Sequence, residues 1–363
     1  MMAAAPLRVG LFGHGWWSKR YLAPALIGAG AVVAGVCGRD LARADAASRE
    51  FGTSEPFDRL ETMLDTVELD ALVVASPPAS HVDAVVTAAA RGLPVFCEKP
   101  LARNADETKT MTEACAGLPT VAGFTQRWNA AIRTAHGLLG ELGELRHLRY
   151  TTASSLSADA SAPWDWRYGA SEYSYGVLSD LGPHAVDLAR WFGGEVTAVS
   201  ATGTTVVGVR ADEAGVGRAV ENWDDCTLDL TLASGARCSL VTSRVLPSSP
   251  YRRFRHELEL IGDRGTLAYT SDRPAEVVLA LSGKQPEVVP ADGMDLGDAA
   301  PGSFEEVMAA MNHGARTQAG DMLAAFRGQH RAHVPTLADG HLGQLVLDAA
   351  ARSITERAPI PVA

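Results

Sequence analysis

The stretch "LFGHGWWSKRYL", residues 11–22, decides how the first third of the chain folds. It ends the short apolar run "LRVGLFG", which predicts a strand, and it opens a segment that predicts a helix. Gly13 and Gly15 match the first two glycines of a dinucleotide-binding loop, which make a tight turn and let the backbone approach a pyrophosphate. Ser18 replaces the third glycine, at a position that needs only a small side chain for close helix–strand packing. We therefore interpret this stretch as a working cofactor loop.

Two tryptophans, Trp16 and Trp17, crowd the same turn and leave a second interpretation open. A pair of glycines can also form a left-handed turn whose neighbouring tryptophans belong to the core, without any nucleotide. The apolar strand before the loop, the helix after it and the βαβ series around it favour the nucleotide site. We expect one tryptophan to pack inward and the other to shield the phosphates.

Composition argues against several classes of protein. The chain has 363 residues, a formal net charge of −11 and no basic block, so a nucleic-acid partner is not expected. Its five cysteines are scattered without a CxxC spacing, which favours reduced thiols, and we expect no metal site. No apolar stretch is long enough to span a membrane, and the N-terminus lacks the features of a secretion signal. A cytoplasmic globular protein without a membrane partner is therefore expected.

The pattern of predicted elements changes near residue 125. Residues 1–125 alternate strand-like and helix-like segments, which predicts a parallel sheet covered by helices on both faces. Residues 126–335 are dominated by period-2 strands, with a hairpin signal at "ASGA", and predict a domain with an antiparallel or mixed sheet. Residues 336–363 predict a closing amphipathic helix and a tail, with Thr336 as the N-cap of the helix.

The end of the second predicted strand, "GVCGRD", bears on which dinucleotide binds. An NAD-specific site usually places Asp or Glu there, to accept hydrogen bonds from the adenosine ribose. This sequence has Gly38 at that position, which leaves room for a 2′-phosphate, and Arg39 next, which can pair with the phosphate. We therefore favour NADP(H). Asp40 keeps NAD(H) open, because a slip of one residue would restore a ribose ligand.

A lysine follows the strand predicted over residues 94–98. In "FCEKPLARN", Lys99 lies beyond the carboxyl end of that strand, where open parallel sheets bind ligands, and Pro100 restrains its backbone. A lysine held over a cleft can donate to a substrate oxygen or shuttle its proton. The alternative is an exposed lysine in a Glu-Lys turn.

A second chemical pattern lies in "GVLSDLGPHAVDLARWFGG". Asp180 and His184 share one face if this stretch is a continuous helix, and Pro183 makes that conditional because proline suits only a first turn. A histidine beside a carboxylate is suited to removing a hydroxyl proton as a hydride leaves the same carbon. The alternative is a helix-capping aspartate and a buried structural histidine.

Aromatic side chains crowd residues 161–176, "SAPWDWRYGASEYSYG", directly before this pattern. Aromatic faces stack on the C–H surfaces of sugars, and an arginine can bind a carboxylate or a phosphate. The alternative is that many of these rings pack between domains or subunits. We expect substrate contacts from this segment and from the place where the chain leaves the first domain, with the candidates Arg127, Asn129, Trp164, Arg167 and Tyr173.

Three motifs together, "GHGWWS", "EKP" and "DLGPHAVD", resemble the Gfo/Idh/MocA oxidoreductases, and the resemblance covers nearly the whole chain. It implies an α/β protein: an N-terminal Rossmann domain with a doubly wound parallel sheet, and a C-terminal α/β domain with an open, mainly antiparallel sheet. The closing helix returns to the cofactor domain in the family. The resemblance also implies nicotinamide-dependent redox chemistry on sugars, cyclitols or related alcohols and carbonyls. A homodimer or homotetramer formed through the C-terminal sheet is expected on the same basis.

The resemblance assigns roles to individual residues. Lys99, Asp180 and His184 fall on the catalytic positions of the family. The positions that line the cofactor in the family are occupied here by Ser76, Pro77, His81 and Glu98.

Two other functions stay open at this point. The family contains non-catalytic sensors that bind a dinucleotide and a partner protein, but a sensor has no need of residues for proton transfer. Some relatives are glycosidases that use tightly held NAD as a transient oxidant. Such an enzyme would keep its cofactor through purification and show no net turnover of added cofactor.

Overall fold

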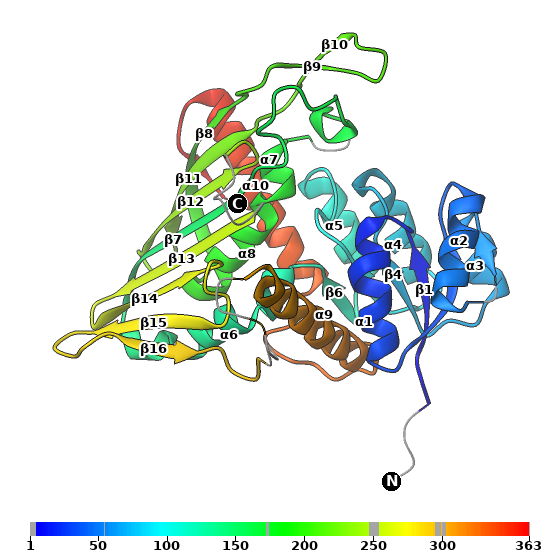
Figure 1. Cartoon of the computed structure of the whole chain (residues 1–363), viewed down its shortest axis with the longest axis horizontal. Helices are drawn as coiled ribbons and strands as arrows, with labels where there is room; N and C mark the ends of the chain where they lie inside the picture. The colour runs from blue at the N-terminus through cyan, green and yellow to red at the C-terminus, as the bar shows by residue number, and fades with distance from the viewer. Residues whose placement is uncertain are drawn as a thin grey trace. The chain divides into compact units, whose positions relative to one another are not determined.

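The computed structural model describes residues 5–53, 55–171, 174–246, 254–294, 299 and 303–362, so Tyr173 lies outside the described residues. The chain forms two units. The first comprises residues 1–128 and 314–341, and the second comprises residues 129–313 and 342–363. The chain passes from one unit to the other after Trp128, and again inside two long helices, which Figure 1 labels α9 (Phe304–Phe326) and α10 (Leu337–Glu356).

The first unit contains a six-stranded sheet in the order β3-β2-β1-β4-β5-β6, in which every neighbouring pair is parallel. β1 lies between β2 and β4, and doubly wound sheets bind their ligands at this reversal of strand order. The expected Rossmann arrangement is confirmed. The strands are β1 (Arg8–Phe12), β2 (Val32–Cys37), β3 (Pro56–Phe57), β4 (Ala71–Val74), β5 (Val95–Cys97) and β6 (Thr120–Ala122).

The strands of this sheet are buried on both faces, as their continuous apolar runs require. In β4, Ala71 and Val73 belong to a core that includes side chains of α1 and α9, whereas Leu72 and Val74 belong to a core with α3, α4 and α5. In the described ranges, no helix is both long and apolar enough to cross a membrane. Besides its parts of α9 and α10, the first unit has the helical segments η1 (a π-helical turn, Ser18–Leu22), α1 (Ala23–Gly28), α2 (Leu41–Phe51), α3 (Leu60–Thr66), η2 (a 3-10 turn, Pro78–Ser80), α4 (His81–Ala89), α5 (Ala105–Ala114) and η3 (Thr125–Trp128).

The start of α10 confirms the N-cap expected from the sequence. The Thr336 hydroxyl accepts a hydrogen bond from the Asp339 N–H at 3.2 Å. The Asp339 carboxylate in turn accepts from the Thr336 N–H at 2.7 Å, so the two residues cap the helix reciprocally.

The second unit contains a nine-stranded sheet in the order β16-β15-β14-β13-β7-β12-β11-β8-β17. Only the pair β7–β12 is parallel among these neighbours, which confirms the open and mainly antiparallel sheet. β9 (Val209–Ala211) and β10 (Gly217–Ala219) form a separate hairpin. The strands of the large sheet are β7 (Leu145–Ser154), β8 (Val196–Thr204), β11 (Asp225–Leu232), β12 (Arg237–Ser243), β13 (Phe254–Gly262), β14 (Gly265–Thr270), β15 (Glu276–Leu281), β16 (Glu287–Pro290) and β17 (Ile360–Pro361).

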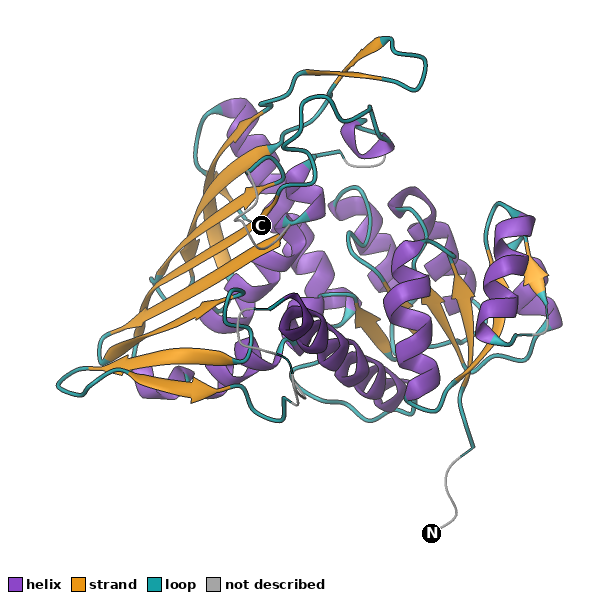
Figure 2. Cartoon of the chain, in the orientation of Figure 1, coloured by secondary structure: helices purple, strands orange, loops and turns teal. Residues whose placement is uncertain are grey.

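Helices cover one face of this sheet, as Figure 2 shows. They are α6 (Ala130–Gly137), α7 (Val177–Asp180), α8 (Gly182–Gly193) and the later part of α10, and they share one core with the strands. The described helices of the unit leave the opposite face of the sheet uncovered (Figure 2). That face carries Arg149, Glu257 and Glu259 on neighbouring strands.

Candidate active site

The loop after β1 has the geometry of a dinucleotide cradle. Gly13 has a φ of 110°, and a Cβ atom at this position would lie 2.4 Å from the Ala75 carbonyl oxygen. Only glycine fits there, and its N–H donates to the Cys37 carbonyl at 2.8 Å. Gly15 is exposed, and no atom lies within 4 Å of the place where its Cβ would stand. The cradle therefore fits a pyrophosphate, because the backbone at Gly15 is open to close approach by a ligand.

Helical structure follows this loop from residue 16 to residue 28 and contains the π-helical turn Ser18–Leu22. Ser18 is fully buried, and its hydroxyl has no hydrogen-bond partner among the described residues. A small side chain thus occupies the position of the third glycine, where the helix approaches the sheet closely. The N–H groups at the start of a helix attract anions, which suits the phosphates of a cofactor.

The two tryptophans of the loop point in different directions. Trp17 packs inward against Tyr21, with a centroid distance of 4.2 Å and tilted ring planes, and donates its indole N–H to the Glu98 carboxylate at 2.7 Å. Trp16 is 66% exposed. The division into one inward and one outward ring agrees with the expectation, while a role of Trp16 over the phosphates stays a prediction.

Glu98 and Lys99 follow β5 at the same edge of the sheet. Glu98 is buried, and its second carboxylate oxygen accepts from the Lys99 backbone N–H at 3.1 Å. Gly123 makes room for it, since a Cβ there would lie 2.7 Å from that oxygen. Burial raises the pKa of Glu98 to about 7, and this outweighs the lowering effects of the Lys99 charge and of the hydrogen bonds from Trp17 and Lys99. Lys99, the next residue along the chain, has a half-buried side chain.

His81 connects the loop after β4 to the loop after β5. Ser76 and Pro77 lie between β4 and η2, and the Ser76 carbonyl is 2.7 Å from His81 Nε2. His81 Nδ1 is 3.1 Å from the carbonyl oxygens of Pro100 and of Leu101. Both ring nitrogens thus face backbone carbonyl oxygens, which hold the ring between the two loops. His81 is 1% exposed, so it supports both loops rather than presenting its ring to a ligand.

The end of β2 is bordered by cationic side chains. A Cβ at Gly38 would lie 2.3 Å from the His14 ring, so this ring covers the glycine. Asp40 caps α2, accepting from the Arg43 N–H at 3.1 Å, and lies 3.4 Å from the Arg43 guanidinium. Arg39 is exposed beside them. The sequence analysis did not include His14, although its position between the two loop glycines indicates a place in the cofactor loop. Burial lowers the pKa of the His14 imidazole.

Asp180 and His184 belong to two helices that follow each other directly. Asp180 is the last residue of α7, and His184 is the third residue of α8, with Leu181 between the helices. Pro183 lies in the first turn of α8, where its missing N–H is not needed. The continuous helix considered for this stretch is therefore interrupted. His184 is 6% exposed, whereas the Asp180 side chain is half-buried.

The aromatic segment before α7 is tied to its own surroundings. The Trp164 indole N–H donates to a β10 carbonyl at 3.1 Å, and the Arg218 guanidinium lies 3.5 Å from the centre of its ring. Arg167 forms an ion pair with Asp165 at 3.0 Å and lies 4.4 Å from the Trp166 ring centre. The guanidinium of Arg167 therefore already has a carboxylate partner.

The two remaining candidates lie on either side of the boundary between the units. Arg127 is buried in η3. Asn129 caps α6 through the N–H groups of Ala131 and Ile132, and its amide donates to the Tyr269 hydroxyl at 2.8 Å. A structural role accounts for these Asn129 contacts.

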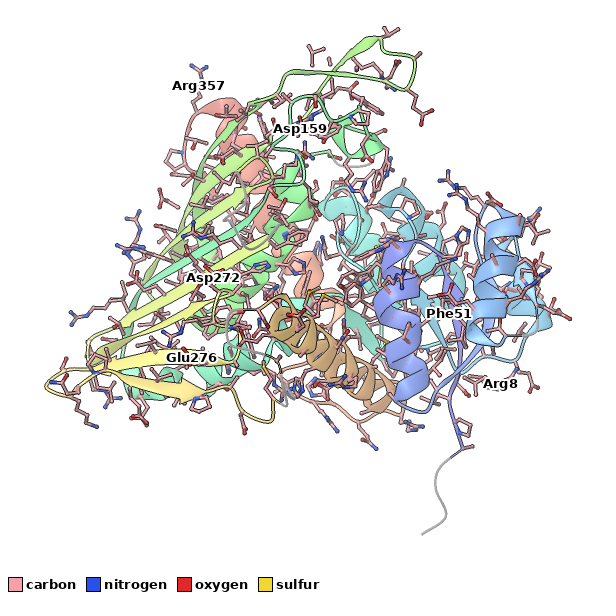
Figure 3. The ribbon with its side chains drawn as sticks, in the orientation of Figure 1. Arg8, Phe51, Asp159, Asp272, Glu276 and Arg357 are labelled. Atoms are coloured by element: carbon pink, nitrogen blue, oxygen red, sulfur yellow. The ribbon has the colours of Figure 1, made fainter. Side chains whose placement is uncertain are left out.

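Sequence reasoning also missed two buried arginines around Tyr168. The guanidinium groups of Arg210 and Arg244 lie 4.6 Å and 5.0 Å from the centre of the Tyr168 ring. Arg210 donates to the carbonyls of Asp159 at 2.7 Å and Ser157 at 2.5 Å; Figure 3 labels Asp159. These contacts hold Tyr168 and the residues just before the aromatic segment, but no local sequence pattern predicts them.

Comparison with known proteins identifies the family. Residues 7–123 match the family model described as "Oxidoreductase family, NAD-binding Rossmann fold", and residues 137–268 match "GFO/IDH/MocA C-terminal domain". The chain belongs to the Gfo/Idh/MocA family. The resemblance noted in the sequence is thereby confirmed.

Three relatives of this chain carry dehydrogenase names. Levoglucosan dehydrogenase of Pseudarthrobacter phenanthrenivorans is 27% identical over 66% of this chain and 65% of its own length, so the match spans just under two thirds of that relative. Inositol 2-dehydrogenase of Rhizobium meliloti is 24% identical over 98% of this chain and 99% of its own. D-xylose 1-dehydrogenase (NADP(+)) 2 of Haloferax volcanii is 32% identical over 54% and 60%.

Solved structures share the fold over the whole chain. A complex of levoglucosan dehydrogenase with NADH and L-sorbose has a TM-score of 0.86 at 24% identity, covering 99% of this chain and 100% of that one. An oxidoreductase domain protein from Kribbella flavida has a TM-score of 0.88 at 25% identity, with the same coverage.

Proposed function

We propose that this protein is an NADP(H)-dependent oxidoreductase that transfers a hydride between the nicotinamide and a hydroxyl or carbonyl carbon of a sugar, cyclitol or related cyclic substrate. One observation carries the proposal. The glycine cradle after β1, the Ser76–Pro77 loop after β4 and the Glu98–Lys99 pair after β5 all occupy the carboxyl edge of one parallel sheet, around its reversal of strand order. The membership of the family and the dehydrogenase names of its relatives agree with this reaction class.

The protein's own residues would manage the proton that accompanies the hydride. The nicotinamide, when bound, accepts or donates the hydride itself. In the oxidation direction, His184 takes the hydroxyl proton, while Lys99 donates a hydrogen bond to the same oxygen and polarises it. Asp180 orients His184 and stabilises its protonated form. In the reverse direction the same groups return the proton to the carbonyl oxygen.

The preference for NADP(H) rests on the end of β2. Gly38 supplies no carboxylate to the adenosine ribose, and Asp40 is engaged as the cap of α2. Arg39 and Arg43 supply positive charge for a 2′-phosphate. Relatives are associated with either cofactor, since one has NADP(+) in its name and another was solved in complex with NADH.

Replacing Arg39 with alanine tests this preference. We expect the Kd of NADPH to rise about tenfold, because a charge-assisted contact to the 2′-phosphate is lost, and the Kd of NADH to stay unchanged. Isothermal titration of both cofactors measures the two constants. Arg59→Ala removes an exposed arginine at the start of α3 and is the control. An equal effect of Arg39→Ala on both cofactors would contradict the assignment.

A neutral polyol is the substrate class that the aromatic segment favours. Trp164, Arg167 and Tyr173, with Arg127 and Asn129, are the proposed contacts. Since Arg167 is already paired with Asp165, an acidic substrate would have to compete for it. The names of the relatives, which refer to levoglucosan, inositol, apiose and xylose, indicate the same class.

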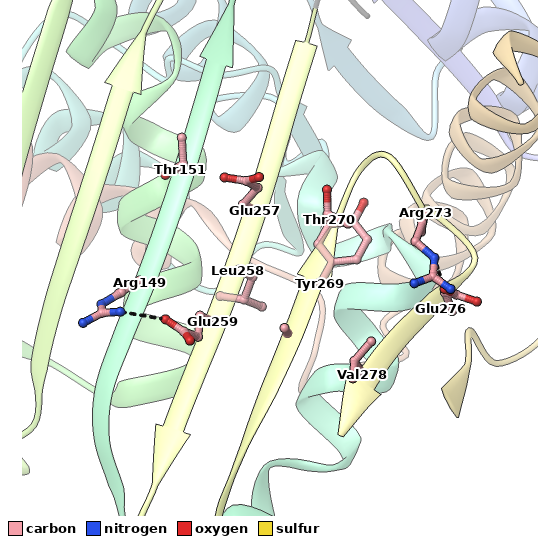
Figure 4. Close-up of a pocket in the computed structure, with 11 residues that line it drawn as sticks. Arg149, Thr151, Glu257, Leu258, Glu259, Tyr269, Thr270, Arg273, Glu276 and Val278 are labelled. Atoms are coloured by element: carbon pink, nitrogen blue, oxygen red, sulfur yellow. Dashed lines mark hydrogen bonds and ion pairs between the residues drawn. The ribbon is translucent and has the colours of Figure 1, made fainter. Parts of the chain in front are cut away.

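A homodimer or homotetramer formed through the uncovered sheet face is also proposed. Figure 4 shows a hollow on this face, in which Arg149 pairs with Glu259 at 3.0 Å and Arg273 pairs with Glu276. Ala268 and Thr270 also line this hollow, so a second copy of the sheet could approach the face closely there.

Sedimentation velocity tests this assembly. We expect a species of two or four times the 38.2 kDa chain mass, and we expect Ala268→Arg, in the middle of the hollow, to shift it to monomers. A wild-type chain that sediments only as a monomer would contradict the proposal.

A further inference from the structure

One hydrogen bond directly connects the glycine loop to the segment that presents Lys99. The indole N–H of Trp17 donates to Glu98 Oε1 at 2.7 Å, although the two residues are 81 positions apart in the sequence. Glu98 is 7% exposed, so this contact is shielded from water. Hydrogen bonds to a buried carboxylate are among the stronger ones in proteins, because little solvent competes with them.

Both partners are held in place by contacts within the protein. The ring of Trp17 packs against the ring of Tyr21, with a centroid distance of 4.2 Å and an interplanar angle of 31°. Glu98 Oε2 accepts from the Lys99 N–H at 3.1 Å, and the Glu98 backbone N–H donates to a carbonyl of β4 at 2.9 Å. Gly123 backs the carboxyl group so closely that no side chain fits behind it. Each carboxylate oxygen thus has one N–H donor, and the donors come from the two segments that the cofactor must contact.

We propose that Trp17 is a positioning residue, whose indole N–H holds the Glu98 carboxylate and thereby fixes the glycine loop and the Lys99 segment in the arrangement that binds the dinucleotide. This inference rests on the proposed cofactor site. Trp17 does not need to touch the reacting atoms. Its contribution is to raise the fraction of molecules that are ready to bind, and apparent affinity scales with that fraction.

The connection depends on pH in a defined direction. A carboxylate accepts from both N–H donors, but a protonated acid must carry its proton on one of the two oxygens and gives up an acceptor position there. The connection is therefore stronger above the pKa of Glu98, which burial raises to about 7, and weaker below it. Lys99 is the charged side chain whose field acts on Glu98 in the described structure, and it favours the carboxylate.

Two variants separate the effect of the Trp17 indole N–H from the effect of the Glu98 charge. Trp17→Phe keeps an aromatic ring on Tyr21 but removes the N–H. Glu98→Gln keeps an acceptor for Trp17 but cannot titrate. Isothermal titration with NADPH and with NADH, one pH unit below and one unit above the pKa of Glu98, gives the binding constants. We expect Trp17→Phe to weaken binding about tenfold at the higher pH, and Glu98→Gln to remove the part of the pH dependence that comes from Glu98.

Tryptophan emission of the cofactor-free protein gives a second readout that a general loss of stability would not produce. We expect a step in emission centred near the pKa of Glu98 in the wild type. The step should persist in Trp16→Phe, the matched control for an adjacent exposed ring, and be absent from both Trp17→Phe and Glu98→Gln. The Glu98→Gln measurement retains Trp17, so it stays decisive even if Trp17→Phe fails to fold.

The outcomes distinguish this inference from the proposed function. If wild-type protein binds neither dinucleotide, the proposed function fails, and the emission step alone then decides whether Trp17 and Glu98 are coupled. If the wild type binds NADPH but Trp17→Phe binds it equally well at both pH values, the positioning role is wrong. An emission step that survives in Glu98→Gln would also overturn it.

Discussion

Replacing Lys99 with methionine is expected to lower kcat/KM for the oxidation of a polyol by about three orders of magnitude. Methionine retains an unbranched apolar stem but has no amine to donate a hydrogen bond to the substrate oxygen or to share its proton. General acid–base catalysis contributes roughly 10²–10⁴-fold to enzymatic rates, and this loss falls within that range. Steady-state kinetics with NADP⁺ measure the loss, and the Kd of NADPH, measured separately, should change far less than kcat.

Lys109→Met is the control for this experiment. Lys109 lies on α5 with a side chain that is 63% exposed, and its partner Glu113 is also exposed. We expect activity within about twofold of the wild type, because exposed ion pairs contribute little to stability. A Lys99→Met enzyme that retains most of its kcat would exclude Lys99 from the proton chemistry.

Replacing Asp224 with alanine is expected to destabilise the protein by about 3–5 kcal/mol, because it leaves the charge of Arg244 buried without its carboxylate. The side chains of Asp224 and Arg244 are 0% and 3% exposed, and they lie 3.3 Å apart. Asp224 also accepts from the Val207 N–H at 2.9 Å. Arg244 donates to the Arg167 carbonyl at 3.2 Å and to the Asn222 amide oxygen at 2.5 Å, so the loss extends to the aromatic segment.

Urea unfolding at equilibrium measures this change in the free energy of unfolding. Glu356→Ala is the control and breaks an exposed ion pair, in which the side chains of Arg352 and Glu356 are 63% and 47% exposed. It should lower the free energy of unfolding by less than about 1 kcal/mol. The double variant Asp224→Ala, Arg244→Met should recover part of the loss, since no unpaired charge remains. Equal costs for the buried and the exposed pair would contradict the argument.

Sequence pattern predicted the layers of the fold well, because those layers follow from local periodicity. The alternation of strand-like and helix-like segments indicated a parallel sheet covered by helices on both faces, and period-2 strands indicated an antiparallel or mixed sheet. The Thr336 cap was predictable since its partner Asp339 is only three residues away. The break between α7 and α8 was visible only as a condition set by Pro183, because proline permits either a kink or a new first turn.

The candidate site was predictable only as far as its motifs extend. The glycine loop and the Glu98–Lys99 pair follow strand ends, so their edge of the sheet could be inferred from topology. The bond between Trp17 and Glu98 and the arginines around Tyr168 join segments far apart in sequence. Such contacts depend on tertiary packing, and a single sequence carries no pattern for them.

The production of reduced nicotinamide is the measurement that tests the central claim most directly. Purified protein is incubated with NADP⁺ and, in turn, with neutral sugars and cyclitols, and the absorbance of the reduced nicotinamide is followed. We predict substrate-dependent reduction in the wild type, and its loss in Lys99→Met. A protein that binds the dinucleotide but reduces neither NADP⁺ nor NAD⁺ with any of these alcohols would contradict the claim and point to a sensor. Cleavage of a glycosidic bond without net reduction of added cofactor would contradict it equally.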